Sequence, residues 1–211
     1  MCGRFVLLTN LSVISENFNI QEITYDYMPS SDVLPSNSVA AVIRDRTNRL
    51  VQFRWGLIPS WAKDPSMGSR LINARAETLA EKPSFKDAFK RRRCLIIADG
   101  FYESLKEGKK KYSFYFRLKT GKPFGFAGLY ETWVSPDGQA VNTCTIVTTE
   151  PNDLIQPIHN RMPVILPKEK EALWIDPAAF NQRELLSILK PYPSAEMEVV
   201  SPTLPGDFFK S

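Results

Sequence analysis

The run L-I-I-A-D-G-F-Y-E, residues 95–103, decides the fold class of this chain. Apolar and small residues lead into Asp99 and Gly100 and then an acid, as in a β-strand over residues 94–102. Six similar runs recur at residues 38–44, 50–56, 112–118, 125–130, 142–148 and 162–166. Most of these runs lie close enough together in the sequence to pair antiparallel, so we expect a chain dominated by β-structure.

Helical patterns are fewer, and several of them open with a proline in the first turn. They cover residues 10–18, 76–81, 83–90, 151–155, 167–174 and 181–189. The regular strand and helix alternation of a doubly wound α/β fold is missing. We therefore predict an α+β fold, with a mostly antiparallel sheet or barrel-like core and surrounding helices.

We expect one domain over residues 1–211. With 211 residues, of which 43% are hydrophobic, the chain can bury one substantial core without disulfide or metal staples. No internal repeat or flexible linker divides the sequence. Residues 191–211, which contain four prolines, are predicted to form an extended tail packed over the surface.

Composition and charge narrow the class of protein. No apolar run approaches the roughly 18–20 residues of a membrane span, and the start of the chain lacks a signal-peptide pattern, so we expect a soluble protein. The net charge of +4 permits an anionic partner such as nucleic acid without demanding one. The basic runs at residues 91–93 and 109–111 are interpreted as solvated faces. Cys2, Cys94 and Cys144 are too far apart in sequence to suggest a disulfide framework or a metal site.

Cys2 is the first candidate for chemistry. Once Met1 is removed, which a small second residue favours, the chain begins with an α-amine and a thiol on adjacent carbons. An α-amine has an ordinary pKa of about 8, so part of it is an unprotonated nucleophile near neutral pH. The amine can capture an aldehyde as an imine, and the thiol can then close a thiazolidine ring. The alternative is a small buried hydrophobe, the role we assign to Cys94 and Cys144 in their apolar strands.

His159 and Glu103 are candidates for proton transfer. His159 is the only histidine, lies just before an apolar run, and has a side chain whose ordinary pKa suits neutral pH. Glu103 follows a buried strand, where burial can raise the pKa of a carboxyl. A structural histidine and an ordinary hairpin charge are the alternatives.

The segment L-I-N-A-R-A-E-T, residues 71–78, alternates Asn73, Arg75 and Glu77 with small alanines. In an extended segment the three side chains project to one face and leave room for a ligand backbone. A helix N-terminus capped by Asn73 is the alternative. Nearby aromatic and basic residues could stack bases and neutralise phosphates of a single strand, unless the tryptophans belong to the core: Arg54, Trp55, Trp61, Lys63 and Arg70.

These residues lie in seven ordered motifs that resemble the SRAP (SOS response-associated peptidase) family of abasic-site-shielding proteins. The motifs are M-C-G-R-F, R-W-G-L-I-P-S-W, I-N-A-R-A-E-T, A-D-G-F-Y-E, F-A-G-L-Y-E-T-W, C-T-I-V-T-T and H-N-R-M-P-V-I-L, and they run nearly the whole length of the chain. The resemblance implies a single SRAP domain that senses abasic sites in single-stranded DNA and links to them covalently, without a cofactor. It also implies a part in the DNA damage response, lyase activity and autoproteolytic removal of Met1.

The resemblance also implies roles for individual residues. Cys2 is the nucleophile that forms a thiazolidine with the ring-opened sugar. Asn73 orients the sugar and the cysteine amine, Glu103 shuttles protons, and His159 assists opening of the sugar ring.

A further set of residues would contact DNA by the same resemblance. Three arginines would grip phosphates: Arg4, Arg75 and Arg161. Pro35 and Trp61 would form a wedge beside the lesion, with Pro29 as a second candidate for the proline. Ser104 stands where the family usually has tryptophan. We expect a monomer with no membrane partner, cytoplasmic or on the nucleoid if the source is a bacterium or phage.

Other classes of protein remain open. An N-terminal-nucleophile glutamine amidotransferase also matures to a chain beginning Cys-Gly, but its motifs N-G-E-I-Y-N and G-H-T-R are absent here. A non-catalytic single-strand binding module would bind DNA in a salt-sensitive way without preferring a lesion. A thiol peptidase that uses Cys, His and Glu would cleave peptides in trans.

Overall fold

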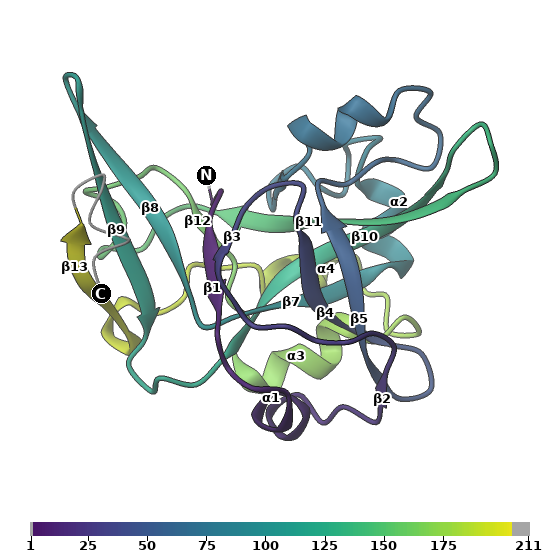
Figure 1. The fold of residues 1–211 in the computed structure, drawn as a ribbon, viewed down its shortest axis with the longest axis horizontal. Coiled ribbons are helices and arrows are strands. Elements are labelled where there is room, and N and C mark those ends of the chain that lie inside the picture. Colours follow the sequence, from purple (N-terminus) through teal and green to yellow (C-terminus); the bar gives the residue numbers. More distant parts are fainter. Residues whose placement is uncertain (1, 204–211) are drawn as a thin grey trace.

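The computed structural model describes residues 2–203. It has the predicted α+β architecture, with two sheets and few helices (Figure 1). Among the described residues, no helix is both long enough and apolar enough to cross a membrane.

Within residues 2–203 the larger sheet has eight strands, and most neighbouring strands pair antiparallel. One short strand, β6, pairs with β11 beside the main path. Along that path the order is β12 (Met162–Pro163), β11 (Ala140–Thr149), β10 (Phe124–Val134), β7 (Arg93–Ala98), β4 (Ser38–Arg44), β5 (Asn48–Trp55) and β2 (Glu22–Ile23), with β6 at Asn73–Arg75.

Five strands of the larger sheet close into a ring. The end of β5 pairs in parallel with β11, where Arg54 lies opposite Thr143 and Trp55 opposite Cys144. The other neighbours, β5 with β4, β4 with β7, β7 with β10 and β10 with β11, pair antiparallel. Trp55 supports the closure, because its buried indole N–H donates to the carbonyl of Ile72 at 2.8 Å.

The smaller sheet has five strands and carries both ends of the described chain. Its order is β13 (Met197–Thr203), β9 (Lys110–Leu118), β8 (Gly100–Glu107), β1 (Phe5–Leu7) and β3 (Ser30–Val33). Residues 197–203 of the expected tail thus form an edge strand against β9, and residues 204–211 lie outside the described part.

The strand expected over residues 94–102 is in fact two strands that belong to different sheets. The break falls at Asp99, between β7 and β8, where the carboxylate accepts hydrogen bonds from the backbone of Leu8 and Thr9. The next residue must be glycine, because a Cβ at Gly100 would overlap the phenol of Tyr115. This crossing places the start of β8, and therefore Glu103, beside the N-terminal strand β1.

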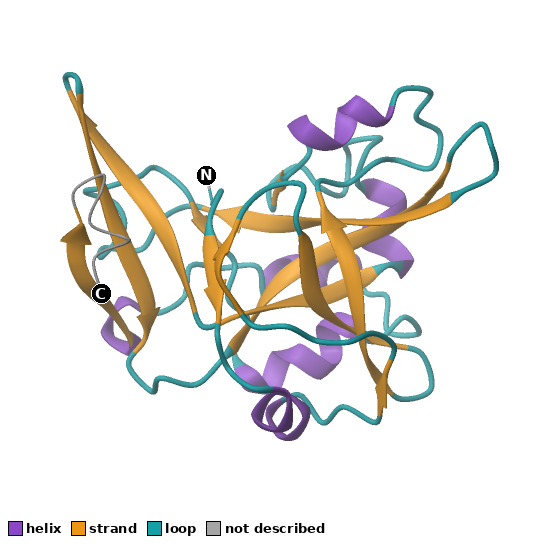
Figure 2. Cartoon of the chain, in the orientation of Figure 1, coloured by secondary structure: helices purple, strands orange, loops and turns teal. Residues whose placement is uncertain are grey.

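Four α-helices of the described chain gather around the ring (Figure 2): α1 (Leu11–Asn17), α2 (Lys86–Arg91), α3 (Lys168–Ile175) and α4 (Gln182–Ser187). Two short 3-10 helices span Pro65–Arg70 and Ser194–Glu196. Asn10 and Asn181 begin α1 and α4 by accepting a backbone N–H in the first turn, the usual role of an asparagine cap.

The sequence predicted helices in two segments where the structure has none. Residues 76–81 and 151–155 form turns. The backbone N–H of Ala76 donates to Thr148 in β11, so this segment continues from a strand, and Asn152 caps a turn by accepting the N–H of Ile155. The helix expected over residues 83–90 begins later, at Lys86.

The core has two main parts, because alternate residues of the ring strands point to opposite faces. Leu95 and Ile97 of β7 pack in a cluster with helix residues such as Trp174 of α3. Cys94, Ile96 and Ala98 of the same strand belong to a second cluster, which includes residues of the smaller sheet and Cys2. The N-terminus therefore enters the molecule between the ring and the smaller sheet.

Candidate functional site

Cys2 is fixed at the start of the chain by the strand that follows it. Phe5 of β1 lies opposite Phe101 of β8, and the N–H of Tyr102 donates to the carbonyl of Arg4 at 2.9 Å. The Cys2 side chain is fully buried, and its carbonyl accepts a hydrogen bond from the Asn73 amide at 2.9 Å. Two distant motifs of the sequence therefore meet at this point.

Asn73 lies in the extended strand β6, which pairs in parallel with β11, so it is not a helix cap. Its side chain is partly buried, and within residues 2–203 its Oδ1 atom has no hydrogen-bond partner. An unsatisfied buried acceptor costs free energy unless a ligand or water supplies a donor. The amide is therefore placed to hold the Cys2 backbone with one atom and a polar ligand group with the other.

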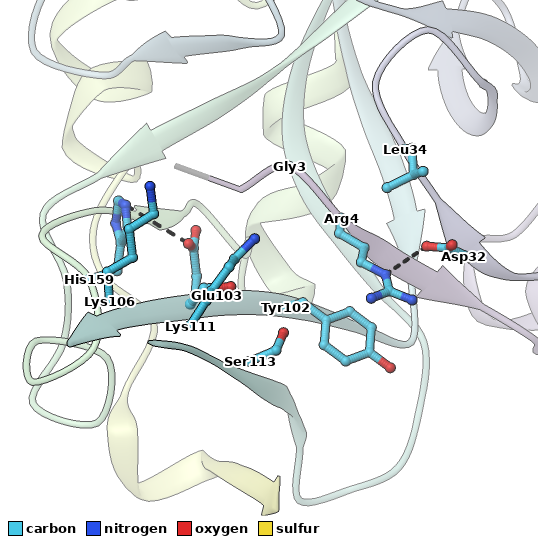
Figure 3. A pocket seen from close by; sticks show the side chains of 11 residues that line it. Gly3, Arg4, Asp32, Leu34, Tyr102, Glu103, Lys106, Lys111, Ser113 and His159 are labelled. Carbon is cyan, nitrogen blue, oxygen red and sulfur yellow. Dashed lines mark hydrogen bonds and ion pairs between the residues drawn. The ribbon is translucent and has the colours of Figure 1, made fainter. Parts of the chain in front are cut away.

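A pocket of about 610 Å³ opens beside this segment (Figure 3). Gly3, Glu103 and His159 lie in its wall, which gives the reactive segment an opening to the surface. The other lining residues come from the segment before β1, from the β3 region, and from β8 and β9: Arg4, Asp32, Leu34, Tyr102, Ser104, Lys106, Lys111 and Ser113.

Glu103 is a buried carboxyl with an unusual proton affinity. Its side chain is 5% exposed, and burial raises its pKa to about 7. At neutral pH both the acid and the carboxylate are therefore populated, as proton transfer requires. The Nε2 atom of His159 lies 3.9 Å from the Glu103 carboxylate (Figure 3).

His159 is oriented by the chain that follows it. The Nδ1 atom lies 3.0 Å from the backbone nitrogen of Arg161 and 3.1 Å from its carbonyl oxygen, so Arg161 can pair with Nδ1 in either tautomer of the ring. The Nε2 atom faces Glu103. Burial lowers the pKa of His159, which favours the neutral ring. The pair can therefore share one proton near neutral pH.

The thiol of Cys2 is a weak acid in this environment. Burial, followed by the charge of Glu103, raises its pKa above the ordinary value. Burial raises the pKa of Cys94 and Cys144 in the same direction, and both lie in the apolar core, as expected from the sequence. Proximity to Glu103 and the pocket distinguishes Cys2 from the other two.

The three arginines expected at phosphates differ in their partners. Arg4 binds Asp32 at 2.6 Å and lies over the Tyr102 ring at 4.6 Å. Arg75 is exposed at the end of β6. Arg161 makes a two-pronged ion pair with Glu77 at 2.8 and 2.9 Å and donates to the carbonyl of Thr148 at 2.6 Å.

The expected wedge residues lie on the surface outside the lining of the pocket. The sequence left open whether the two tryptophans face solvent or belong to the core. Trp61 is 55% exposed, whereas Trp55 is buried in the core. Pro35 is partly buried in a turn that ends β3, closed by the N–H of Asn37 donating to Leu34, and Pro29 is exposed. Arg54, Lys63 and Arg70 are also exposed.

Sequence reasoning missed some of the pocket. Asp32, Lys106 and Ser113 were not singled out, and Lys111 was interpreted only as part of a solvated basic run. No group of three metal-ligating side chains lies close together within residues 2–203.

Comparison with known proteins points to one family. The model of the SOS response associated peptidase (SRAP) family matches residues 1–203. The abasic site processing protein YoqW of Bacillus subtilis is 48% identical over 202 residues, which cover 94% of this chain and 90% of that protein. The mouse abasic site processing protein HMCES is 30% identical over 84% of this chain and 62% of its own. A crystal structure of a Bacteroides thetaiotaomicron protein superposes with a TM-score of 0.85 at 26% identity, covering 94% of this chain and 90% of that one.

Proposed function

The chain belongs to the SRAP family, and from this premise we propose that it captures abasic sites in single-stranded DNA on Cys2. The observation that carries the proposal is that four residues far apart in the sequence come together: Glu103 and His159 line the pocket, and Cys2, held by Asn73, lies buried beside Gly3 in the pocket wall. The names of the relatives fit the same substrate, because YoqW and HMCES are both called abasic site processing proteins.

The first step of the proposed reaction needs a free α-amine on Cys2. Hydrolysis of the bond between Met1 and Cys2 consumes one water and supplies that amine. The amine attacks the aldehyde carbon of the ring-opened sugar, and the resulting carbinolamine loses water to give an imine. Glu103 in its acid form protonates the leaving hydroxyl, which its pKa of about 7 allows.

The second step closes the ring. The Cys2 thiol adds to the imine carbon, and its proton passes through Glu103 to the nitrogen, so the product is a neutral thiazolidine. The raised pKa of the thiol explains why the amine acts first, because little thiolate is present at neutral pH. We assign opening of the sugar ring to His159, which in its Nε2-protonated tautomer can donate that proton to the ring oxygen.

Residues other than Cys2, Glu103 and His159 bind the sugar and the DNA strand. Asn73 holds the Cys2 carbonyl and offers its free Oδ1 to the amine or to a sugar hydroxyl. Trp61 and Pro35 are the wedge beside the lesion, and three arginines hold phosphates: Arg4, Arg75 and Arg161. Because an imine also permits β-elimination, we propose lyase activity alongside capture, and shielding of the lesion as the biological result.

Denaturing gel electrophoresis of the protein with a single-stranded oligonucleotide holding one abasic site tests this function. A denaturation-resistant band is expected from the parent protein after mass spectrometry has verified loss of Met1, and none from Cys2→Ser. Glu103→Gln and His159→Ala should slow its formation and change the pH profile. A band that persists in Cys2→Ser, or no band from the verified parent, would contradict capture by Cys2.

A further inference from the structure

The hairpin β8–β9 carries a stripe of paired identical residues on one face. Successive cross-strand partners two residues apart share a face, and here they are Tyr102 with Tyr115, Ser104 with Ser113, and Lys106 with Lys111. The two tyrosine rings lie 4.9 Å apart. Figure 3 shows that Tyr102, Ser113, Lys106 and Lys111 border the same pocket as Glu103 and His159.

The lysine pair is unfavourable in the free protein. Like charges directly opposite each other across two strands repel, and β-hairpins usually avoid such pairs. Lys106 and Lys111 are both exposed, and within residues 2–203 neither of them forms an ion pair. Their neighbours at the next register, Glu107 and Lys110, have opposite charges and so compensate each other.

The surroundings of the lysine pair favour an anion. Three of the residues that line the pocket are fixed cations, and two are carboxyls. One carboxyl, Asp32, is already bound to Arg4. The other, Glu103, is buried, and burial raises its pKa to about 7 although the charge of Lys111 acts to lower it, so the carboxyl is only partly ionised at neutral pH. An anion between the two ammonium groups would remove their repulsion, and the hydroxyls of Ser104 and Ser113 are available beside it.

We propose that Lys106 and Lys111 together hold one phosphate of the single strand next to the captured sugar, so that the hairpin face is part of the DNA-binding surface. This inference rests on the proposed function, because the reactive groups and the lysine pair share one pocket. The hairpin projects from the body of the molecule and can follow a strand that leaves the pocket (Figure 1). The proposal extends the expected DNA surface beyond Arg4, Arg75 and Arg161.

The test measures non-covalent binding of a single-stranded oligonucleotide by fluorescence anisotropy over a range of salt concentrations. All proteins carry Cys2→Ser, so the result does not depend on the covalent chemistry. Lys106→Gln/Lys111→Gln should weaken binding several-fold at low salt and reduce the slope of log K against log salt by about 0.7, the loss expected for one phosphate on a single strand. The matched control is Lys109→Gln/Lys110→Gln, which removes the same charge from the same hairpin outside the pocket lining.

A second measurement separates binding from a structural role. Because the pair repels in the free protein, the double variant should melt at the same or a higher temperature than its parent. An unchanged slope, an equal effect of the control, or a lower melting temperature that accounts for the weaker binding overturns the proposal.

The crosslinking gel with the Cys2 protein separates the two proposals. A normal band together with an unchanged salt slope overturns the lysine site alone. No band together with the expected fall in slope overturns capture by Cys2 and leaves the lysine site intact. If the parent protein does not bind single-stranded DNA at all, both proposals fail.

Discussion

Glu103 is placed where its charge opposes folding. Its pKa is about 7 in the folded chain, against an ordinary value near 4.5, because burial disfavours the carboxylate. Because the folded chain holds the Glu103 proton more tightly than the unfolded chain, this carboxyl contributes stability that is fully present below pH 4.5. That contribution is lost as the pH rises through 7. Glu103→Gln has no such loss, so its free energy of unfolding relative to wild type should rise by roughly 3 kcal/mol between pH 4 and pH 8.

Urea unfolding at a series of pH values measures this difference. Glu107→Gln is the matched control, since it removes an exposed carboxyl from the same strand and should show no comparable trend. A difference between Glu103→Gln and wild type that stays constant with pH would mean that the buried carboxyl does not titrate in this window. Confirmation would show that the proposed proton shuttle is maintained at a cost in stability.

Arg161 is occupied by a carboxylate at the position where the family resemblance expects a phosphate. Glu77 binds the guanidinium with two hydrogen bonds, and this contact lowers the pKa of Glu77. A phosphate would have to compete with this carboxylate for the same donors. Glu77→Gln should therefore bind single-stranded DNA several-fold more tightly and with a steeper salt dependence.

Anisotropy titrations against salt check this expectation, with Glu81→Gln as the variant that removes an exposed charge nearby. Equal gains in the two variants would show only the effect of net charge. Weaker binding by Glu77→Gln would instead mean that Glu77 orients Arg161 and, through its backbone, His159.

Arg93 joins three elements from a buried position. The sequence predicted a solvated basic face over residues 91–93, and for Arg93 this is wrong, because the side chain is buried and belongs to β7. Its guanidinium donates to backbone carbonyls at the end of α2, the end of α3 and the loop beyond: Phe89, Lys90, Trp174, Asp176 and Ala179.

Arg93→Met would leave these carbonyls without a donor. We expect it to lower the free energy of unfolding by about 4 kcal/mol, since each unsatisfied buried acceptor costs roughly 1 kcal/mol or more. Arg91→Met, at an exposed position of the same run, should change stability by less than about 0.5 kcal/mol. Chemical denaturation of the two variants compares them directly. Similar losses of unfolding free energy would contradict a stabilising role for the hydrogen bonds of Arg93.

The strands were predictable from local patterns, whereas their connections were not. The β-rich runs at residues 38–44, 50–56 and 112–118 correspond closely to β4, β5 and β9. The parallel contact of Trp55 with Cys144 joins residues far apart in the sequence, and no periodicity in either segment predicts it. The change of sheet at Asp99 was missed for the same reason, since a strand pattern does not show which sheet its two halves join.

The candidate site was found from motifs rather than from local physics. Cys2, Asn73, Glu103 and His159 were named from the sequence, and in the fold Glu103 and His159 line one pocket while Cys2 and Asn73 meet beside it. The lysine pair was missed because its significance depends on the register of β8 with β9, which a charge run alone does not reveal. The sequence also did not predict that Asp32 and Glu77 pair with two of the expected phosphate-binding arginines, because these contacts depend on the whole fold.

At the scale of the whole molecule, the three cysteines differ in how much structure must open to expose them. Each is fully buried. Cys94 and Cys144 lie in ring strands, so their exposure requires that the ring itself unfold. Cys2 precedes β1, so we expect a local opening of the first residues to expose it at a small fraction of the global free energy of unfolding.

We therefore expect a thiol-reactive reagent under native conditions to label Cys2 at least tenfold faster than Cys94 or Cys144. Peptide mass spectrometry after timed labelling gives the three rates, and mild urea should accelerate the ring cysteines in step with global unfolding while changing Cys2 little. Asn73→Ala removes the hydrogen bond to the Cys2 carbonyl and should raise the Cys2 rate alone. If the three thiols react at one rate, the N-terminus opens only when the molecule unfolds, and capture of a bulky DNA aldehyde would then have to proceed through the pocket with the segment in place.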